Sequence, residues 1–513
     1  MDDSQQKAGK NHSPTDIAIV GMSCVFPQAP DIQTFWKNIV NKKNAITDPP
    51  ADRLIDDVFD SGVDANDRIY CRRGGYIDDN TEFNPIDYGI MPVSVEGAEP
   101  EHFMALKVAQ AALKDAGFGE LPFNKEKFEV ILGRGTYVNR GYVNLLQHGL
   151  VVDQTLALLK QLHPDIAAET LADIKTSLKS SLPPFSTETA PGLASSVMTG
   201  IIANRMDLKG RTYTVDAACA SALIALENAV QDLADGHSDA ALVGAVQIST
   251  PAVIHMLFTQ LNALSRHESL KPFDSATDGT MLGEGIGMVV LKRLDDAIRD
   301  GHRIYAVVKA VGSSSDGKAK GLLAPRPEGE AMALSRAYAK ASIDPASIGL
   351  IEAHGTGLRL GDATEIASLG SLFGNDGARK DKIAVGTVKS MIGHLIPAAG
   401  IAGIIKTALA LYHKTLPATL GIENPNEELG IDKTPLYLNT ETRPWIHGRD
   451  GAPRRAGVNA FGFGGINAHT ILEEYSGPSP GQVCLNRQRE CEFVGISAES
   501  REALVEACRN VVA

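Results

Sequence analysis

Aromatic residues and cysteines are scarce in this sequence. Phe, Trp and Tyr make up 5% of the 513 residues, and the 6 cysteines lie far apart, with no CxxC pair and no Cys/His cluster at metal spacing. No run of about 18 uninterrupted apolar residues occurs, and the polar N-terminus lacks the apolar core of a secretory signal. We therefore expect no disulfide framework, no metal site and no membrane span, in a soluble protein of the cytoplasm.

Basic residues are fewer than acidic residues. There are 49 lysines and arginines against 62 acidic residues, a net charge of −13, which argues against a surface for nucleic acid. We interpret the basic pairs at 72–73 and 454–455 as solvated surface, with a docking patch for an acidic partner as the alternative. Glycine (49 residues) and hydrophobic residues (43%) are plentiful, which is typical of a large, well-packed α/β enzyme.

Short apolar segments alternate with helical patterns along most of the chain. This alternation predicts the α/β class, with largely parallel sheets covered on both faces. The strand-like segments are residues 16–27, 127–135, 213–220, 239–249, 285–294, 304–314, 348–357 and 383–390.

Three segments depart from this rhythm. Residues 1–15 are polar and are expected to be a disordered tail, and residues 137–186 read as a helix-rich insertion. The Pro, Gly and Ser of "EEYSGPSPGQ" predict a boundary near residue 476. The remainder, 476–513, offers one strand and one helix, too little to fold alone, so we expect the chain to be part of a longer polypeptide.

Cys219, in "YTVDAACASAL", stands where a strand gives way to an amphipathic helix. Backbone N–H groups at a helix N-terminus favour the thiolate, which is the reactive form of cysteine. The surrounding alanines and serine would let an acyl group approach, as at a strained nucleophile turn. A small buried hydrophobe is the alternative for a single cysteine.

Two histidines occupy similar junctions. His354 ends the strand of "IGLIEAHGTG", and His394 lies between the strand "IAVGTVKS" and an apolar helix. Ligands of open α/β sheets gather at the carboxyl ends of strands. Either histidine alone could be structural, but two histidines and a cysteine at such positions together indicate a catalytic site.

At these residues the sequence resembles the β-ketoacyl synthases. The motifs are "VDAACASAL", "EAHGTG" followed by "GD", "GTVKSMIGH" and "NAFGFGGINAH", in the family's order, and the likeness extends over residues 16–475. The resemblance implies the thiolase fold, with two similar αβ halves in a five-layer α-β-α-β-α stack and a homodimer. We expect the halves at 16–260, carrying Cys219, and 261–475, carrying His354 and His394.

Finer features resemble the iterative branch of the family, which includes polyunsaturated fatty acid synthases. These features are "VDAACASAL", "KGLLAPRPEGEAMALSRAY" and the long segment 137–186. The segment 476–513 resembles the start of the linker that joins a ketosynthase to a downstream acyltransferase domain in the same polypeptide. The implied partner is an acyl carrier protein whose phosphopantetheine delivers the substrates, and no cofactor is expected in this domain itself.

The resemblance also implies residue roles. Cys219 accepts the acyl chain, and His354 and His394 donate hydrogen bonds to the enolate formed when a malonyl thioester loses CO2. Backbone N–H groups of Cys219 and Phe463 form the oxyanion hole, and the Phe463 ring gates the acyl chain. Lys389 is expected to pair with Glu365.

Thr356 matches one of two threonines that bind the pantetheine arm in the family. At the place of the second threonine this sequence has Leu358, which is a departure from the pattern.

Three functions follow from these residues. The leading one is an elongating acyltransferase of the β-ketoacyl synthase type, which extends a chain by two carbons through decarboxylative condensation. A non-elongating domain that holds an acyl chain is the alternative, although such domains often lose a histidine and both are present here. A cysteine hydrolase would lack its usual local signature and leave one histidine unused.

Overall fold

The computed structural model describes residues 15–51, 58–60, 67–135, 139–318, 321, 323–374, 382–447, 452–477, 496, 498 and 500–512. The predicted tail at 1–15 lies outside this part except for its last residue. The chain divides into a large unit, residues 1–476, and a small unit, residues 477–513. The small unit contains the predicted helix, α14 (Arg501–Val512), while the predicted strand falls largely outside the described residues.

The described strands match the eight predicted strand-like segments as far as residue 386, and the five strands after that residue are not among the predictions. They are β1 (Ile17–Val25), β2 (Phe128–Gly133), β3 (Thr212–Val215), β4 (Ala240–Gln247), β5 (Gly285–Arg293), β6 (Ala306–Ser315), β7 (Leu350–Glu352), β8 (Ile383–Gly386), β9 (Thr415–Leu416), β10 (Leu436–Leu438), β11 (Arg443–Pro444), β12 (Arg455–Gly462) and β13 (Ile466–Glu473).

The α-helices lie mainly between these strands. They are α1 (Ile32–Val40), α2 (Pro100–Asp115), α3 (Arg140–Leu146), α4 (Val152–Leu162), α5 (Ala168–Ser181), α6 (Ser196–Met206), α7 (Ser221–Ala234), α8 (Ala252–Gln260), α9 (Leu294–Arg299), α10 (Pro327–Ala341), α11 (Arg359–Phe373), α12 (Lys389–Ile392) and α13 (Ala399–Tyr412).

The large unit repeats one arrangement of strands twice. In the first half the strand order is β3-β2-β4-β5-β1, and in the second half it is β8-β7-β12-β13-β6 with β10 added at the edge. In both halves the first three strands pair in parallel and the last two pair antiparallel. This repetition confirms the two similar αβ halves.

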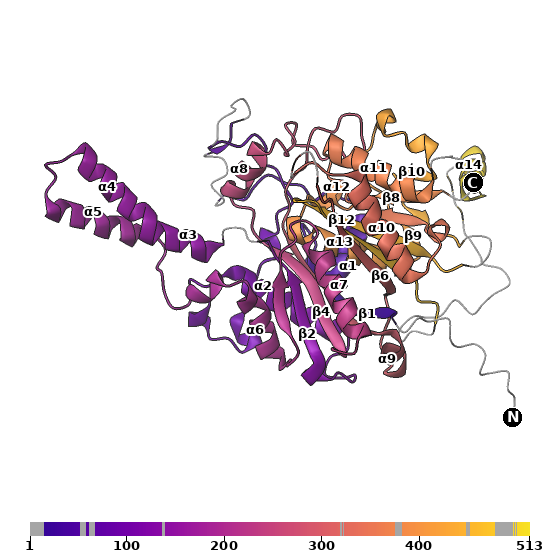
Figure 1. The fold of residues 1–513 in the computed structure, drawn as a ribbon, viewed down its shortest axis with the longest axis horizontal. Helices are drawn as coiled ribbons and strands as arrows, with labels where there is room; N and C mark the ends of the chain where they lie inside the picture. The colour runs from indigo at the N-terminus through magenta and orange to yellow at the C-terminus, as the bar shows by residue number, and fades with distance from the viewer. Residues whose placement is uncertain are drawn as a thin grey trace. The chain divides into compact units, whose positions relative to one another are not determined.

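Five layers follow from the packing of helices on the two halves (Figure 1). Helices α2 and α6 cover the outer face of the first half, and α10 covers the outer face of the second. Helices α7 and α13 lie buried between the halves and share the largest hydrophobic core. Gly400 of α13 brings the two central helices together, because a Cβ there would lie 3.1 Å from Cβ of Ala222.

Three features differ from the sequence prediction. The sheet is not largely parallel, because β1, β5, β6 and β13 pair antiparallel with their neighbours. The halves are not separate sheets, because β1 pairs antiparallel with β6 at Ile17–Ile19 and joins the strands into one 11-stranded mixed sheet. The predicted division of the halves at 260/261 is also wrong, because β5 completes the first half. The second half begins at β6, so the division lies between Arg293 and Ala306.

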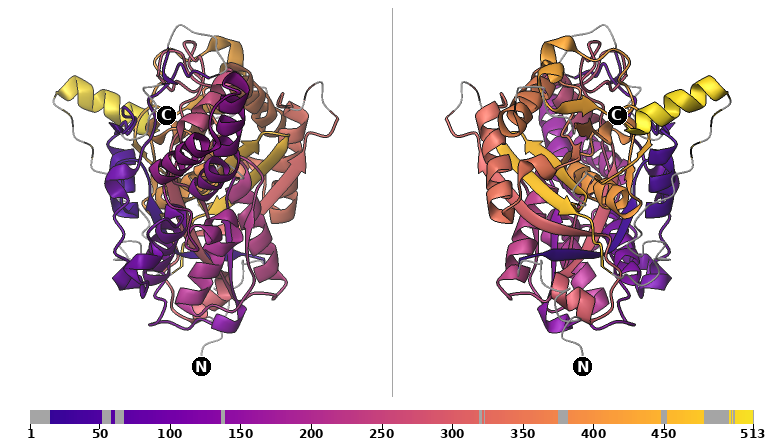
Figure 2. Two further views of the ribbon diagram at one scale, coloured as in Figure 1. Left: turned by 90° about the vertical axis from the view of Figure 1, so that its left-hand side faces the viewer. Right: turned by 90° about the vertical axis from the view of Figure 1, so that its right-hand side faces the viewer.

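The helix-rich segment is a projecting arm. From residue 139 on, it consists of α3, a π-helical turn (Gln147–Val151), α4 and α5. Helices α4 and α5 pack on each other and stand away from the layers of the large unit (Figure 1), and the left view of Figure 2 faces this arm.

In the described residues no helix has the length and apolarity needed to cross a bilayer.

Candidate active site

Cys219 lies in a strained turn between β3 and α7. The preceding residue, Ala218, has φ of 49°, a left-handed conformation that is costly for a residue with a Cβ and that recurs at functional sites. Ser221 holds the turn closed, because its Oγ accepts a hydrogen bond from the Ala217 N–H at 2.8 Å and donates one to the Ala218 carbonyl at 2.6 Å. The strained turn expected from the small residues is present.

The loop between β12 and β13 comes close to this turn. A Cβ on Gly462 would lie 2.6 Å from the Ala217 carbonyl oxygen, so only glycine allows the approach. Burial raises the pKa of Cys219 to about 11, while nearby Lys389 and the backbone N–H groups of Phe463 and Cys219 itself lower it. The resting thiol is therefore protonated at neutral pH, and the helix N-terminus does not by itself produce the thiolate.

His354 is held by its backbone. It follows β7, and its N–H and that of Gly355 each donate to one oxygen of the Glu365 carboxylate, at 2.7 and 2.8 Å. Gly355 has φ of 39°, which the turn requires. The His354 Nδ1 is buried and has no hydrogen-bond partner within the described residues. Burial, followed by Lys389 and His394, lowers the pKa of His354 well below 6.5.

His394 lies in the turn after α12. Its N–H donates to the Met281 carbonyl at 2.7 Å, and its Nδ1 accepts from the Ile396 N–H at 3.2 Å. Because Nδ1 is an acceptor, the neutral ring carries its proton on Nε2. Burial and then Lys389 lower the pKa of His394 well below 6.5, so this neutral form is the one present at neutral pH.

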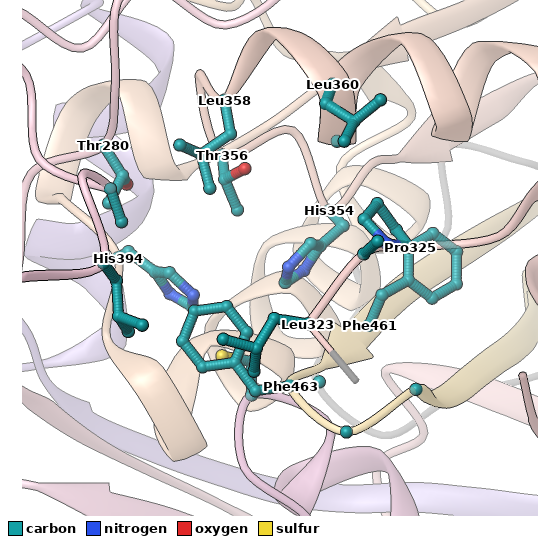
Figure 3. Close-up of a pocket in the computed structure, with 18 of the residues that line it drawn as sticks. Thr280, Leu323, Pro325, His354, Thr356, Leu358, Leu360, His394, Phe461 and Phe463 are labelled. Atoms are coloured by element: carbon teal, nitrogen blue, oxygen red, sulfur yellow. The ribbon is translucent and has the colours of Figure 1, made fainter. Parts of the chain in front are cut away.

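Cys219, His354 and His394 line one cavity of about 400 Å³. The two imidazole rings lie nearly perpendicular with centroids 5.5 Å apart, and Phe463 lines the same cavity (Figure 3). Phe463 also packs against Phe258 at 5.9 Å between ring centroids. Sequence reasoning thus selected three reactive groups, far apart in the chain, that the fold brings together.

Thr356 and Leu358 line the same cavity (Figure 3). Thr356 is buried, and Leu358 packs against the apolar cluster that includes Cys219 and Phe258. Farther along the same segment, Leu360 is exposed at the cavity lining together with Arg359. The residue that departs from the family pattern therefore adds apolar surface to the cavity.

The predicted ion pair between Lys389 and Glu365 is not formed. No nitrogen–oxygen contact within 4.0 Å joins these two described residues. The Glu365 carboxylate is instead occupied by the two backbone N–H groups and by Asn459 Nδ2 at 2.8 Å. Lys389 is buried close enough for Glu365 to raise its pKa, although burial lowers that pKa overall. Glu365 orders the histidine turn through hydrogen bonds and not through the lysine.

Sequence reasoning missed polar groups on the cavity wall. Glu330, Asp316 and Asn467 line it, and Asn467 Nδ2 donates to Asp316 Oδ1 at 2.7 Å. Burial and the neighbouring Glu365 raise the pKa of Glu330 to about 9, so this carboxyl is protonated at neutral pH. Glu330 belongs to the charged stretch "RPEGEAM", in which no local pattern distinguishes a buried carboxyl from an exposed one.

Models of one protein family match nearly the whole chain. The N-terminal domain of β-ketoacyl synthases matches residues 15–297, the C-terminal domain matches 305–423, and a ketoacyl-synthetase C-terminal extension matches 425–513. The chain belongs to the β-ketoacyl synthase family. The gap between the first two matches agrees with the division of the halves between β5 and β6.

Curated relatives of this β-ketoacyl synthase are much longer proteins. It is 36% identical over 507 residues to a component of the polyunsaturated fatty acid synthase of Thraustochytrium, a match that covers 97% of this chain and 18% of that protein. It is 34% identical over 477 residues to polyketide synthase PksN of Bacillus subtilis, a match that covers 91% of this chain and 8% of that protein. The chain thus spans less than a fifth of the length of either relative.

Solved ketosynthase structures have the same fold. The ketosynthase from module 6 of the bacillaene synthase of Bacillus subtilis matches with a TM-score of 0.74 and 33% identity over 90% of this chain and 72% of that one. A ketosynthase domain for oxazolomycin from Streptomyces albus matches with a TM-score of 0.76 and 29% identity over 91% of this chain and 76% of that one. The thiolase fold of the ketosynthases is therefore confirmed.

Proposed function

We propose that this domain is an elongating condensing enzyme, which joins an acyl group held on Cys219 to a malonyl unit on an acyl carrier protein. The observation that carries the proposal is the shared cavity. One cysteine and two neutral histidines face it, and the proton of His394 sits on the ring nitrogen that is not bonded to Ile396. A thiol hydrolase would need one histidine as a base, whereas two neutral donors suit a developing enolate.

In the first half-reaction the Cys219 sulfur attacks the thioester carbonyl of an acyl carrier protein. A carbon–sulfur bond to Cys219 forms, the bond to the pantetheine sulfur breaks, and the cysteine proton passes to the leaving pantetheine thiolate. The backbone N–H groups of Phe463 and Cys219, which lower the pKa of the Cys219 thiol, would stabilise the carbonyl oxygen as it becomes negative. Lys389 favours the thiolate that the attack requires.

In the second half-reaction a malonyl thioester occupies the pocket. Its bond to the carboxylate breaks, CO2 leaves, and the electron pair forms an enolate whose oxygen accepts hydrogen bonds from His354 and His394. The enolate carbon attacks the acyl carbonyl, a carbon–carbon bond forms, and the Cys219 thiolate departs. Because the pKa of Cys219 is raised to about 11 by burial, this thiolate takes up a proton from solvent and the resting thiol is restored.

We also propose three interactions. The domain receives its substrates from an acyl carrier protein, is followed by an acyltransferase domain in the same polypeptide, and forms a homodimer. The length of the relatives and the match to a C-terminal extension support further domains after this one. The exposed apolar side chains of the arm, among them Leu150, Leu158 and Leu162, together with the edge position of β3, support contact with a second copy. Sedimentation velocity of the protein and of an arm-deleted variant tests the dimer.

The presence of a polyunsaturated fatty acid synthase among the relatives supports the iterative branch. A carrier-protein assay tests the function itself. The protein is loaded with an acyl thioester and mixed with malonyl carrier protein, and the carrier species are read by intact mass. We expect a carrier-bound β-ketoacyl product. Acyl transfer without elongation would favour the acyl-holding alternative, and free acid would favour a hydrolase.

A further inference from the structure

A buried ion pair lies outside the lining of the cavity. Lys406 of α13 and Glu352 of β7 are 1% and 2% exposed, and the distance from Lys406 Nζ to Glu352 Oε2 is 2.6 Å. Burying two charges is expensive, and an apolar pair of the same size is often as stable. The pair is therefore a poor candidate for a purely stabilising role.

The surroundings of the pair are built around the Glu352 carboxylate. A Cβ on Gly403, one turn before Lys406, would lie 3.1 Å from Glu352 Cγ, so glycine in this helix leaves room for the acid. The other carboxylate oxygen accepts a hydrogen bond from the Val388 N–H at 2.7 Å. Glu352, at the end of β7 and two residues before His354, thus connects this strand with the central helix α13 and with the residue directly before Lys389.

Electrostatic effects connect this ion pair to Cys219 through Lys389. Among the groups that raise the pKa of Lys389, Glu352 has the largest effect, ahead of Glu365 and Cys219, while burial and Lys406 lower it. Lys389 in turn lowers the pKa of Cys219, on which burial and Asp216 act in the opposite direction. Lys389 also lowers the pKa of both histidines, after burial.

We propose that Glu352 and Lys406 are a positioning pair, which holds Lys389 in place as a cation and thereby sets the reactivity of the Cys219 thiol. Neither residue lines the cavity, so the pair acts through Lys389 and not on the substrate. Lys406 pairs with Glu352, and Glu352 both anchors the backbone before Lys389 and has the largest effect among the acids that act on Lys389. The inference deepens the proposed function, but thiol reactivity can be measured whether or not the protein condenses acyl chains.

The test removes both charges and keeps the shape. In the double variant Glu352→Gln/Lys406→Met the amide oxygen can still accept from Val388, and a neutral buried pair is compatible with folding. Iodoacetamide alkylation of Cys219 is followed at pH 8 by peptide mass spectrometry. Because Lys389 loses its largest counter-charge, we expect about tenfold slower alkylation, corresponding to a rise of about one unit in the pKa of Cys219.

Two comparisons separate this effect from a general loosening of the fold. In a Lys389→Met background the double substitution should change the rate less than about twofold, because the group through which it acts is already absent. The matched control is Asp16→Asn/Lys309→Met, which removes another buried pair with an Nζ–Oδ2 distance of 2.6 Å and should leave the Cys219 rate unchanged. An unchanged rate in the Glu352/Lys406 variant, an equal loss in the Lys389→Met background, or an equal loss in the control would overturn the proposal.

Discussion

The imidazole rings of His354 and His394 lie nearly perpendicular, at 87°, with their centroids 5.5 Å apart. The two residues follow neighbouring parallel strands, β7 and β8, and the carboxyl ends of such strands open at the same edge of the sheet. Each ring is uncharged because burial and the Lys389 cation disfavour a second proton. Two neutral imidazoles thus line the cavity that Cys219 also lines.

Replacing either histidine should separate the two half-reactions. His354→Ala and His394→Ala should still become acylated at Cys219, because neither ring is needed to form that thioester. Decarboxylation of malonyl carrier protein should fall on the order of 10² to 10³ for each lost donor. Mass spectrometry of the acyl-enzyme and CO2 release measure the two steps, and an undiminished CO2 rate in either variant would refute the assigned role.

Decarboxylation should depend little on pH across the neutral range. The pKa of each histidine is lowered well below 6.5, so both rings stay neutral as the pH falls from 8 to about 6 and gain a proton only in more acidic solution. The rate of CO2 release should therefore be flat over that interval and change below it. A titration centred near the ordinary histidine pKa of about 6.5 would mean that the rings are solvated in the working enzyme.

Replacing Leu358 with the threonine that the family has at this position should be tolerated. Leu358→Thr adds one neutral hydroxyl, a change of about 1 kcal/mol, and should alter the apparent affinity for malonyl carrier protein less than about tenfold. Thr356→Val removes the hydroxyl that matches the family's other threonine and should impair both half-reactions. Loss of all activity in Leu358→Thr, or full activity in Thr356→Val, would show that the pantetheine arm does not pass between these residues.

The reactive residues and the repeat were more predictable from the sequence than their environment. The motifs around Cys219, His354 and His394 identified groups that share one cavity, and alternating elements predicted the strands from β1 to β8. The division of the halves was misplaced because β5 returns antiparallel beside β1, a pairing that strand patterns do not encode. The helix N-terminus beside Cys219 is visible in the sequence, whereas burial, which dominates the pKa of this thiol, is not.

The residues that pair with buried charged side chains are the feature that is least predictable from the sequence. The family resemblance pairs Lys389 with Glu365, whereas Glu365 is occupied by backbone N–H groups and Asn459. The pair formed at Lys406 and Glu352 joins residues in a central helix and a strand. Such contacts depend on packing distances that neither spacing nor composition contains.

The buried Glu330 carboxyl group should lower the free energy of unfolding as the solution becomes alkaline. Burial and then Glu365 raise its pKa to about 9 in the folded protein, against about 4.5 for a free side chain, so the folded state binds the extra proton between these values. Stability from this group is complete in acid and is lost as pH rises through this range. Glu330→Gln keeps an acceptor for Ser368 Oγ, which lies 2.9 Å away, and should raise the melting temperature more at pH 8.5 than at pH 5. An equal change at both pH values would contradict the raised pKa.

The central claim is that Cys219 holds an acyl chain while the histidines generate a carbon nucleophile beside it. The most direct measurement is a single turnover of acylated protein with malonyl carrier protein, in which CO2 and the carrier product are quantified together. The account predicts one CO2 and one carrier-bound β-ketoacyl chain, two carbons longer, for each acyl group lost from Cys219, and no such product from Cys219→Ala. Loss of the acyl group as free acid, or elongation by Cys219→Ala, would contradict it.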